Sequence, residues 1–511
     1  MSALAAGAAA VSLEPPLGLP MVGFVRRHEP ATSSAGDLEA TAVVLEDEDG
    51  GRAVVIGVDT LAIQAPEIDA LRERIAAATG APLEAVLVNF NHTHCAPPGC
   101  LALARLGGEI DDAGVDPAVA AYVETLAERI VQVARVAASR LEPARPAWGV
   151  GVCHESVNRR ERRADGRVIL GWNPDGIVDP QVPVLQLRRR DGSAIATVVG
   201  FGCHTVAVGP DVLAYSADYP GPMREAVRAW TGGECVFLQG AGGNVLPRVG
   251  FATGFGPARA MGRRLALAAL AAVADRPAWP IRHERRDDGS VNPISLYRPV
   301  PSDGGATTLA ATALDVAFPL QPLPTADELA EVRADTARRI AQARARGAGP
   351  GELNTIRYHA VWADLAEAAM AAGLTEPSVT APVHALRVGD GAIVTGPGEV
   401  FSEIGLAVRE RSPAEVTLYA GYTNGLLTYF PSRSAFPHGG YEPGHGNRSF
   451  GLPSQVTPEC DPILVRTGLE ALGRCFPQWD GIAPGDDLLA SGTPPAAPPA
   501  VPPAPPLQRQ P

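Results

Sequence analysis

Residues 84–99 read EAVLVNFNHTHCAPPG, an apolar segment followed by a polar loop with two histidines. The run from Glu84 to Phe90 is apolar, which is typical of a buried strand. Two histidines, His92 and His94, follow it one residue apart. A histidine at the end of a strand can bind a metal, relay a proton or satisfy a local hydrogen bond. A lone one most often makes a hydrogen bond, so its partners elsewhere in the sequence decide its role.

Strand-like and helical patterns alternate through most of the chain. The strand-like runs are 41–45, 52–59, 85–89, 184–187, 194–202, 235–239, 383–388, 392–395 and 416–420, and AAAVSLEPP near the N-terminus is a further strand with its turn. Apolar residues recur at helical spacing in 65–78, 117–140, 222–230, 258–274, 326–346, 354–372 and 401–409. This alternation predicts an α/β fold with a mixed β-sheet core flanked by helices.

Composition excludes several classes of function. The chain has 511 residues, of which 46% are hydrophobic and 19% charged, so it is predicted to be globular. The net charge of -13 argues against a nucleic-acid partner, because neutralising phosphates requires clustered cations. All 43 basic residues are arginine. Without lysine there is no Schiff base, no pyridoxal phosphate anchor, no P-loop lysine and no carbamylated metal bridge.

The cysteines and the termini predict a cytoplasmic protein. The seven cysteines form no CxxC pair, which indicates scattered thiols in a reducing compartment. The apolar N-terminus lacks a basic segment and is interrupted by Glu14, Pro15 and Pro16, so it does not resemble a signal peptide. No window approaches the roughly 18 to 20 apolar residues of a membrane span. We expect one catalytic domain over 1–485, an excursion at 285–305 and a disordered proline-rich tail at 490–511.

Polar residues follow many of the apolar runs, at the strand ends where α/β proteins collect ligands. They are Asp59, Asn91, His92, His94, His204, the Gly-rich QGAGGNVLPR, Glu399, Asn424 and Tyr429. Each alone has an ordinary explanation as a cap, a turn or a hydrogen-bonding group. If the strands are neighbours in one sheet, however, His92, His94, His204 and Glu399 converge. Imidazoles combined with a carboxylate suit zinc.

Several motifs, in order from residue 6 to about 480, resemble those of neutral, non-lysosomal ceramidases. The NHTHCAPPG loop is similar to a THTHSGPGG-type loop, and AAAVSLEPPLGLPMVGF is similar to the family's opening strand and turn. Further motifs of the family are resembled by Asn158-Arg159, GFGCHTVAVG, SADYPG, GPGEVFSEIG and GYTNGLLTYFPSRSAFPHGGYE, although Leu426 stands at the first tyrosine of the last one. The resemblance implies a ceramidase catalytic-domain fold and a zinc amidase that splits an N-acyl bond.

The resemblance also implies residue roles. One zinc ion per chain would be held by His92, His204, Glu399 and Tyr429, and His94 would transfer a proton. Arg159 and Tyr441 would stabilise the oxyanion, and Asn158, Asp218 and Asn244 would contact the substrate. The substrate would be a small-molecule or lipid-like N-acyl compound.

The chain departs from the ceramidase pattern at GGNVLPR, which stands where the family has GDVSPN. Asn244 replaces the acid and Leu246 replaces a serine associated with the active site. The chain also ends soon after the catalytic region, so we expect no C-terminal immunoglobulin-like domain. The prediction is therefore a zinc-dependent amide hydrolase whose substrate need not be ceramide.

Three other hypotheses stay open. A ceramidase-like scaffold could serve cyclisation or acyl transfer in small-molecule biosynthesis. An amidohydrolase of the TIM-barrel type fits less well, because several strands precede His92 and the bridging lysine is missing. The third hypothesis is a metal-free binding module whose proline-rich tail docks a partner. The sequence does not decide the oligomeric state.

Overall fold

The computed structural model describes residues 4–27, 29–106, 110–111, 114–274, 281–292, 294–301 and 307–481. The predicted proline-rich tail, 490–511, lies outside the described residues. No helix in the described part of the chain is both long enough and apolar enough to cross a bilayer.

An eight-stranded mixed sheet forms the centre of the protein and confirms the predicted fold class. Its order is β14-β12-β11-β8-β1-β3-β4-β5. The strands are β1 Leu4–Ser12, β3 Glu39–Glu46, β4 Arg52–Val58, β5 Val86–Phe90, β8 Glu142–Val152, β11 Gln181–Arg188, β12 Ala194–Phe201 and β14 Glu234–Gln239. The β4–β5 and β12–β14 pairs are parallel, and the other neighbours are antiparallel. Strands β5 and β12 are buried at every position, as expected for strands covered on both faces.

Four helices cover one face of this sheet: α1 Glu67–Thr79, α3 Pro117–Ala138, α4 Pro220–Thr231 and α5 Gly256–Ala274. Helix α3 shows why these segments are helical. Asp116 caps its N-terminus by accepting a hydrogen bond from the Ala118 amide at 2.8 Å, and Pro117 stands at the first position. Leu126, Ile130 and other apolar residues at helical spacing then point into the core.

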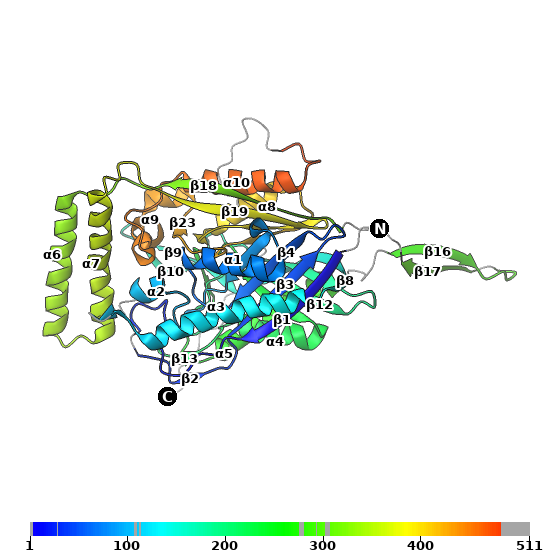
Figure 1. The fold of residues 1–511 in the computed structure, drawn as a ribbon, viewed down its shortest axis with the longest axis horizontal. Helices are drawn as coiled ribbons and strands as arrows, with labels where there is room; N and C mark the ends of the chain where they lie inside the picture. Colours follow the sequence, from blue (N-terminus) through cyan, green and yellow to red (C-terminus); the bar gives the residue numbers. More distant parts are fainter. Residues whose placement is uncertain are drawn as a thin grey trace.

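A second sheet packs on the other face of the large sheet. It consists of β18 Leu309–Pro319, β19 Ser378–Val388, β20 Gly391–Thr395 and β22 Thr417–Ala420. Leu185 and Val198 of the large sheet share one buried cluster with Leu386 and Leu418 of the second. Helices α8 Ser402–Arg411 and α10 Cys460–Cys475 pack on the second sheet's outer face. The protein therefore has four layers, with helices outside and two sheets inside (Figure 1).

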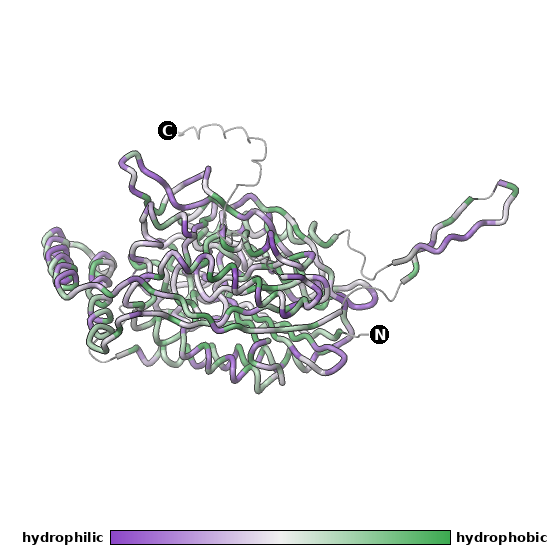
Figure 2. Tube along the Cα trace, turned by 90° about the horizontal axis from the view of Figure 1, so that it is seen from above, coloured by the Kyte–Doolittle hydropathy of each residue, from purple (hydrophilic) through white to green (hydrophobic). Residues whose placement is uncertain are grey.

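Two hairpins extend from opposite ends of these layers (Figures 1 and 2). One is helical, α6 Ala326–Ala345 with α7 Pro350–Ala371, and the other is β16 Ile281–Asp287 with β17 Ser295–Pro301. The β hairpin overlaps the excursion predicted at 285–305. The short elements are β2 Ser33–Ser34, η1 Leu83–Ala85, α2 Leu101–Leu106, β6 Ile110–Asp111, β7 Gly114–Val115, β9 Ser156–Arg162, β10 Val168–Asn173, β13 Ala214–Tyr215, β15 Val245–Pro247, β21 Glu399–Val400, β23 Tyr429–Phe430, η2 Arg433–His438, α9 Tyr441–Gly444 and η3 Gly446–Phe450.

The route by which the strand ends meet differs from the sequence-based expectation. Strands β5 and β12, which precede the histidines, lie near opposite ends of the large sheet, and β20, which precedes Glu399, belongs to the second sheet. They still converge because the large sheet curls until β14 contacts β3, β4 and β5. The Asn89 side chain joins the two edges: its Oδ1 accepts from the Gln239 amide at 2.7 Å, and its Nδ2 donates to the Gly421 carbonyl at 2.6 Å.

Candidate metal centre

Three histidines meet where the curled sheet brings its strand ends together. His92 and His94 lie in the loop after β5, and His204 lies in the loop after β12. Ligand nitrogens of the three side chains all lie within 4.8 Å of one another. His92 adopts a left-handed backbone conformation with φ 62°, which is uncommon for a residue other than glycine and is often found at functional sites.

Backbone carbonyls orient two of the three rings. His92 Nδ1 lies 3.0 Å from the Leu61 carbonyl oxygen, and His204 Nδ1 lies 2.8 Å from that of Gly242. A carbonyl only accepts hydrogen bonds, so each Nδ1 carries the proton and each Nε2 keeps its lone pair. Histidines that bind metals are held in the same way by a second hydrogen bond that sets the tautomer.

Glu399 and Tyr429 complete the group, and backbone pairing places them side by side. Strands β21 and β23 are parallel and pair Glu399 with Tyr429. The Glu399 carboxyl oxygens lie 3.5 Å from His92 Nε2 and 2.9 Å from His204 Nε2. The Tyr422 hydroxyl donates to Glu399 Oε2 at 3.3 Å. All four predicted zinc ligands therefore lie in one buried group.

Burial disfavours charge on the side chains of this group. Desolvation lowers the pKa of His92 to about 4 despite the nearby Glu399, and it also lowers the pKa values of His94 and His204. Desolvation raises the pKa of Glu399, although His92 and Arg159 oppose this shift. Burial therefore disfavours the charged forms of both the histidines and Glu399. Neutral imidazole is the form that binds a metal.

Arg159 supplies a fixed positive charge beside the histidines. Its Nη1 lies 2.9 Å from His204 Nε2, and its Nε donates to Glu442 Oε1 at 2.8 Å. The other Glu442 oxygen accepts from Arg160 Nη1 at 2.7 Å. Burial works against the charged form of Arg159, but Tyr429, Glu442 and Glu399 together raise its pKa. The guanidinium is thus held in place by a buried carboxylate.

Two side chains at the site have buried polar atoms without partners. Both ring nitrogens of His94 and the Nη2 of Arg159 make no hydrogen bond. Buried polar groups are almost always satisfied, so unpaired groups next to four other potential ligands indicate a site built for a ligand. The donor set of imidazole, carboxylate and phenol oxygen fits zinc. Either His94 or the pair Glu399 and Tyr429 can complete a set that begins with His92 and His204.

The other predicted site residues bind parts of the chain itself. The Tyr441 ring lies 5.4 Å from that of Tyr429, but its hydroxyl bonds Ser449 at 2.8 Å. Asn158 Nδ2 donates to the Ile177 carbonyl, and Asn244 Nδ2 donates to Glu403. The Asp218 oxygens accept from the amides of Val208 and Tyr219. Their substrate contacts stay predictions.

Sequence reasoning missed Tyr422 and Glu442. Both stand inside the quoted motif 421–442, next to residues that were singled out, but nothing in the pattern indicates that one contacts Glu399 and the other anchors Arg159. The cysteines agree with the expected scattered thiols, because all seven are free and buried. Burial raises the pKa of the Cys95 thiol to about 12, which does not favour a thiolate at this site.

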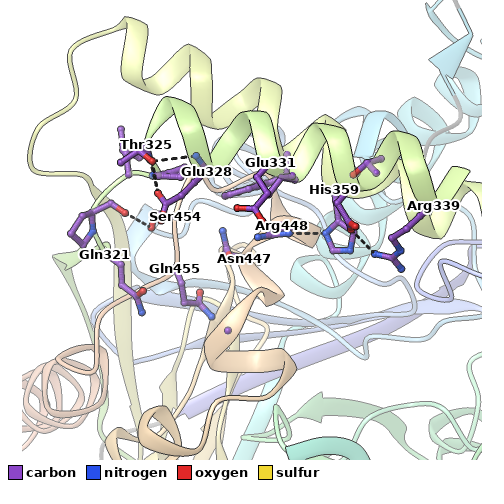
Figure 3. Close-up of a pocket in the computed structure, with 18 residues that line it drawn as sticks. Gln321, Thr325, Glu328, Glu331, Arg339, His359, Asn447, Arg448, Ser454 and Gln455 are labelled. Carbon is purple, nitrogen blue, oxygen red and sulfur yellow. Dashed lines mark hydrogen bonds and ion pairs between the residues drawn. The ribbon is translucent and has the colours of Figure 1, made fainter. Parts of the chain in front are cut away.

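A cavity of about 770 Å³ lies away from this group, between the helical hairpin and the segment after α9 (Figure 3). Glu328 and Glu331 of α6 and His359 of α7 line one side, and Asn447 and Arg448 line the other. None of the histidines at the site lines the cavity. The two regions are connected through Gln455, whose side chain donates to the Glu442 carbonyl.

Two solved structures share this fold. The crystal structure of neutral ceramidase from Pseudomonas aeruginosa matches with a TM-score of 0.63 and 18% identity, over 96% of this chain and 77% of that chain. A ceramidase complexed with C2 matches with a TM-score of 0.62 and 18% identity, over 96% and 78%. No protein-family model and no curated protein matches the sequence. The fold is therefore ceramidase-like.

Proposed function

We propose that this protein is a zinc-dependent hydrolase that cleaves the amide bond of an N-acyl compound. One observation carries the proposal. His92, His204, Glu399 and Tyr429 come together from three separate parts of the chain and form a buried donor set beside unpaired atoms of His94 and Arg159. Two known ceramidases share the fold, which supports amide hydrolysis as the reaction. Residues 1–485 would form one catalytic domain with one zinc ion.

Zinc, when bound, polarises an acyl carbonyl and makes water more acidic. The chain's own residues would supply the other functions. Carbonyls of Leu61 and Gly242 keep the His92 and His204 rings in the ligating tautomer. The unpaired His94 ring would accept a proton and return it to the leaving amine. Arg159, held by Glu442, would hydrogen-bond the developing oxyanion through its unpaired Nη2, and Tyr441 would assist.

Metal analysis and an activity screen test this proposal. The purified protein should contain one zinc per chain, and His204→Ala should lose it. His94→Gln should keep the zinc and lose activity if His94 transfers a proton. Loss of zinc from His94→Gln would instead make His94 a ligand. The zinc-loaded protein is then screened against N-acyl amines, N-acyl amino acids and ceramides, and a wild-type protein that binds no metal would contradict the proposal.

A second candidate function is a non-hydrolytic step, namely cyclisation or acyl transfer. Leu246, in place of the family's serine, favours it, because this apolar side chain pairs across strands with Val157, two residues before Arg159. The reaction run in ¹⁸O-labelled water separates the two functions. A hydrolase places label in a released carboxylate, whereas an acyl transfer or a cyclisation does not.

A further inference from the structure

An apolar wall stands next to the histidine group. Val157, Val206 and Leu246 form a small buried cluster, and Phe24 packs against it. The Phe24 ring lies 4.7 Å from the His94 ring, so the wall continues directly from the unpaired imidazole. Leu246, at 9% exposure, is the most exposed of the three cluster residues.

The pairing of strands β9 and β15 places this apolar wall on the same face as Arg159. Strand β15 pairs with β9 so that Leu246 lies opposite Val157. Side chains two residues apart on a strand share a face, and paired residues share it too. Arg159, two residues after Val157, therefore lies on the same face as Leu246, and it contacts His204 from there.

The outer end of the wall is aromatic, exposed and strained. The Phe251 ring lies 6.1 Å from Phe24 and is 51% exposed. Its backbone has φ 55°, a conformation that is a genuine outlier for a bulky residue. Hydrogen bonds fix it there, since its amide donates to the Val206 carbonyl at 2.8 Å. Strain of this kind persists at ligand-binding positions because the surrounding structure enforces it.

Charge selects which half of an amide substrate fits this wall. The Arg27 guanidinium lies 5.1 Å from the Phe24 ring centroid, and Arg159 is charged at the inner end. A leaving group that becomes a cationic amine would be repelled by the Arg27 guanidinium, whereas the charge of Arg159 is balanced by Glu442. An uncharged alkyl or aryl chain would not be repelled, and its carbonyl would then point toward Arg159.

We propose that Phe24, Leu246 and Phe251 form the subsite for the apolar acyl chain of the substrate and set its length preference. This inference rests on the proposed function, since it takes the acyl carbonyl to lie at the histidine group. The chain would run outward from Leu246, across Phe24, to the exposed ring of Phe251.

Alkyl hydroxamates of two and eight carbons test the subsite by calorimetry on the zinc-loaded protein. The hydroxamate group binds zinc in both compounds, so a difference in affinity measures the contact between the alkyl group and the apolar wall. Each methylene that becomes buried should tighten binding about fourfold. We expect octanohydroxamate to bind at least about tenfold more tightly than acetohydroxamate. Leu246→Asn should abolish most of this difference and leave acetohydroxamate unchanged.

The control is Leu374→Asn, the same substitution at a leucine that is 44% exposed and belongs to none of the clusters around the site. It should preserve the chain-length effect. Phe251→Ser removes an exposed ring and serves as the second variant if Leu246→Asn does not fold. Equal affinity for both hydroxamates, or a chain-length effect that survives Leu246→Asn and Phe251→Ser, overturns the subsite.

The same binding measurements distinguish a failure of the proposed zinc site from a failure of the apolar subsite. If acetohydroxamate does not bind the wild-type protein, the zinc centre is contradicted. The binding of octanohydroxamate then measures only the contact between its alkyl chain and the apolar wall. Weaker binding in Phe251→Ser supports the apolar subsite without zinc, and unchanged binding contradicts the subsite as well.

Discussion

Arg159 is expected to stabilise the oxyanion, and it is held in place by Glu442. A substitution can test the first role while Glu442 keeps another partner. Replacing it with alanine removes the unpaired Nη2 that faces the site, while Glu442 keeps its contact with Arg160. Loss of one oxyanion donor typically costs about 10² to 10³ in rate. We expect Arg159→Ala to lose activity by about that factor and to keep its zinc. Arg163→Ala, an exposed neighbour, is the control, and wild-type turnover in Arg159→Ala would exclude this role.

Gly23 tests how tightly the His94 ring is held. A Cβ at this position would lie 2.5 Å from His94 Cγ, and the backbone has φ +99°. Gly18 has a similar φ of +93° but nothing within 4 Å of its Cβ position. Alanine at either position should cost about 1–2 kcal/mol of stability through backbone strain. Only Gly23→Ala should also shift the His94 imidazole signals in NMR spectra and reduce activity. Equal effects of the two variants would contradict a close role for Gly23.

At the residue scale, residue chemistry indicated three of the four candidate ligands, and the family motif added the fourth. His92, His204 and Glu399 follow apolar strand runs, so their chemistry and position both point to a ligand set. Tyr429 came only from the family pattern, because a tyrosine in a loop carries no metal signal of its own. Tyr422 and Glu442 could not be predicted, since their importance lies in the single side chain that each contacts.

Helix α4 is bound to the large sheet by partly buried ion pairs, and these predict how the stability depends on pH. Arg228 donates to both Glu39 oxygens, at 2.8 and 2.5 Å, and Arg224 also contacts Glu39 at 2.8 Å. Burial raises the pKa of Glu39, but the two arginines outweigh it and bring it to about 2, from an ordinary 4.5. A lowered carboxyl pKa stabilises the fold above pH 4.5, and this contribution is lost as the pH falls through about 2.

Glu39→Gln should therefore be less stable than the wild type at pH 7, by an amount on the order of 2–3 kcal/mol. The difference should shrink between pH 4.5 and about 2, the interval set by the two Glu39 pKa values. Denaturant unfolding at a series of pH values measures it. Glu225→Gln, on the exposed side of the same helix, should follow the wild-type curve. A difference that stays constant down to pH 2 would rule out Glu39 as its source.

At the element scale, every helix that was predicted is present, but several strands, among them the long strand β18, and helix α10 were missed. Every helical pattern expected from spacing corresponds to a helix, within a few residues at each end. Strand β8 was missed because its sequence, EPARPAWGVGV, contains two prolines and few alternating residues. Strand β9, SVNRRER, was missed because Arg159 and Arg160 face the buried Glu442 carboxylate instead of solvent. Helix α10 was also absent from the expected elements, although its buried residues recur at helical spacing.

At the scale of the whole molecule, the sequence could not predict how the strand ends converge. The expectation required adjacent strands, whereas the real path is a sheet that curls until β14 reaches β5 and a second sheet that packs against it. Twist accumulates over eight strands and depends on small steric effects at each pair. The total twist therefore cannot be predicted from any local sequence pattern. The convergence was expected only for neighbouring strands in one sheet, so the topology that achieves it was not predicted.

Asn89 links strand β5 to strand β14 where the curled sheet brings them together, so its substitution tests this arrangement directly. The side chain is 1% exposed and bonds the Gln239 amide, the Gly421 carbonyl and the Thr423 hydroxyl. These partners belong to the end of β14 and to the loop that carries Tyr422, so Asn89 ties together the segments that bring His204 and Glu399 to His92. Leucine has a similar size but would leave buried backbone groups unpaired, at about 1–3 kcal/mol each.

We expect Asn89→Leu to lower the free energy of unfolding by about 2–5 kcal/mol, measured with denaturant. It should also weaken zinc binding in a chelator competition, because the ligands sit on loops that are no longer held together. Asn292→Leu, an exposed position in the β hairpin, should change neither quantity. If Asn89→Leu lost stability but kept wild-type zinc affinity, the closure would contribute to folding without positioning the ligands. Only a joint loss supports the curled sheet as the device that assembles the site.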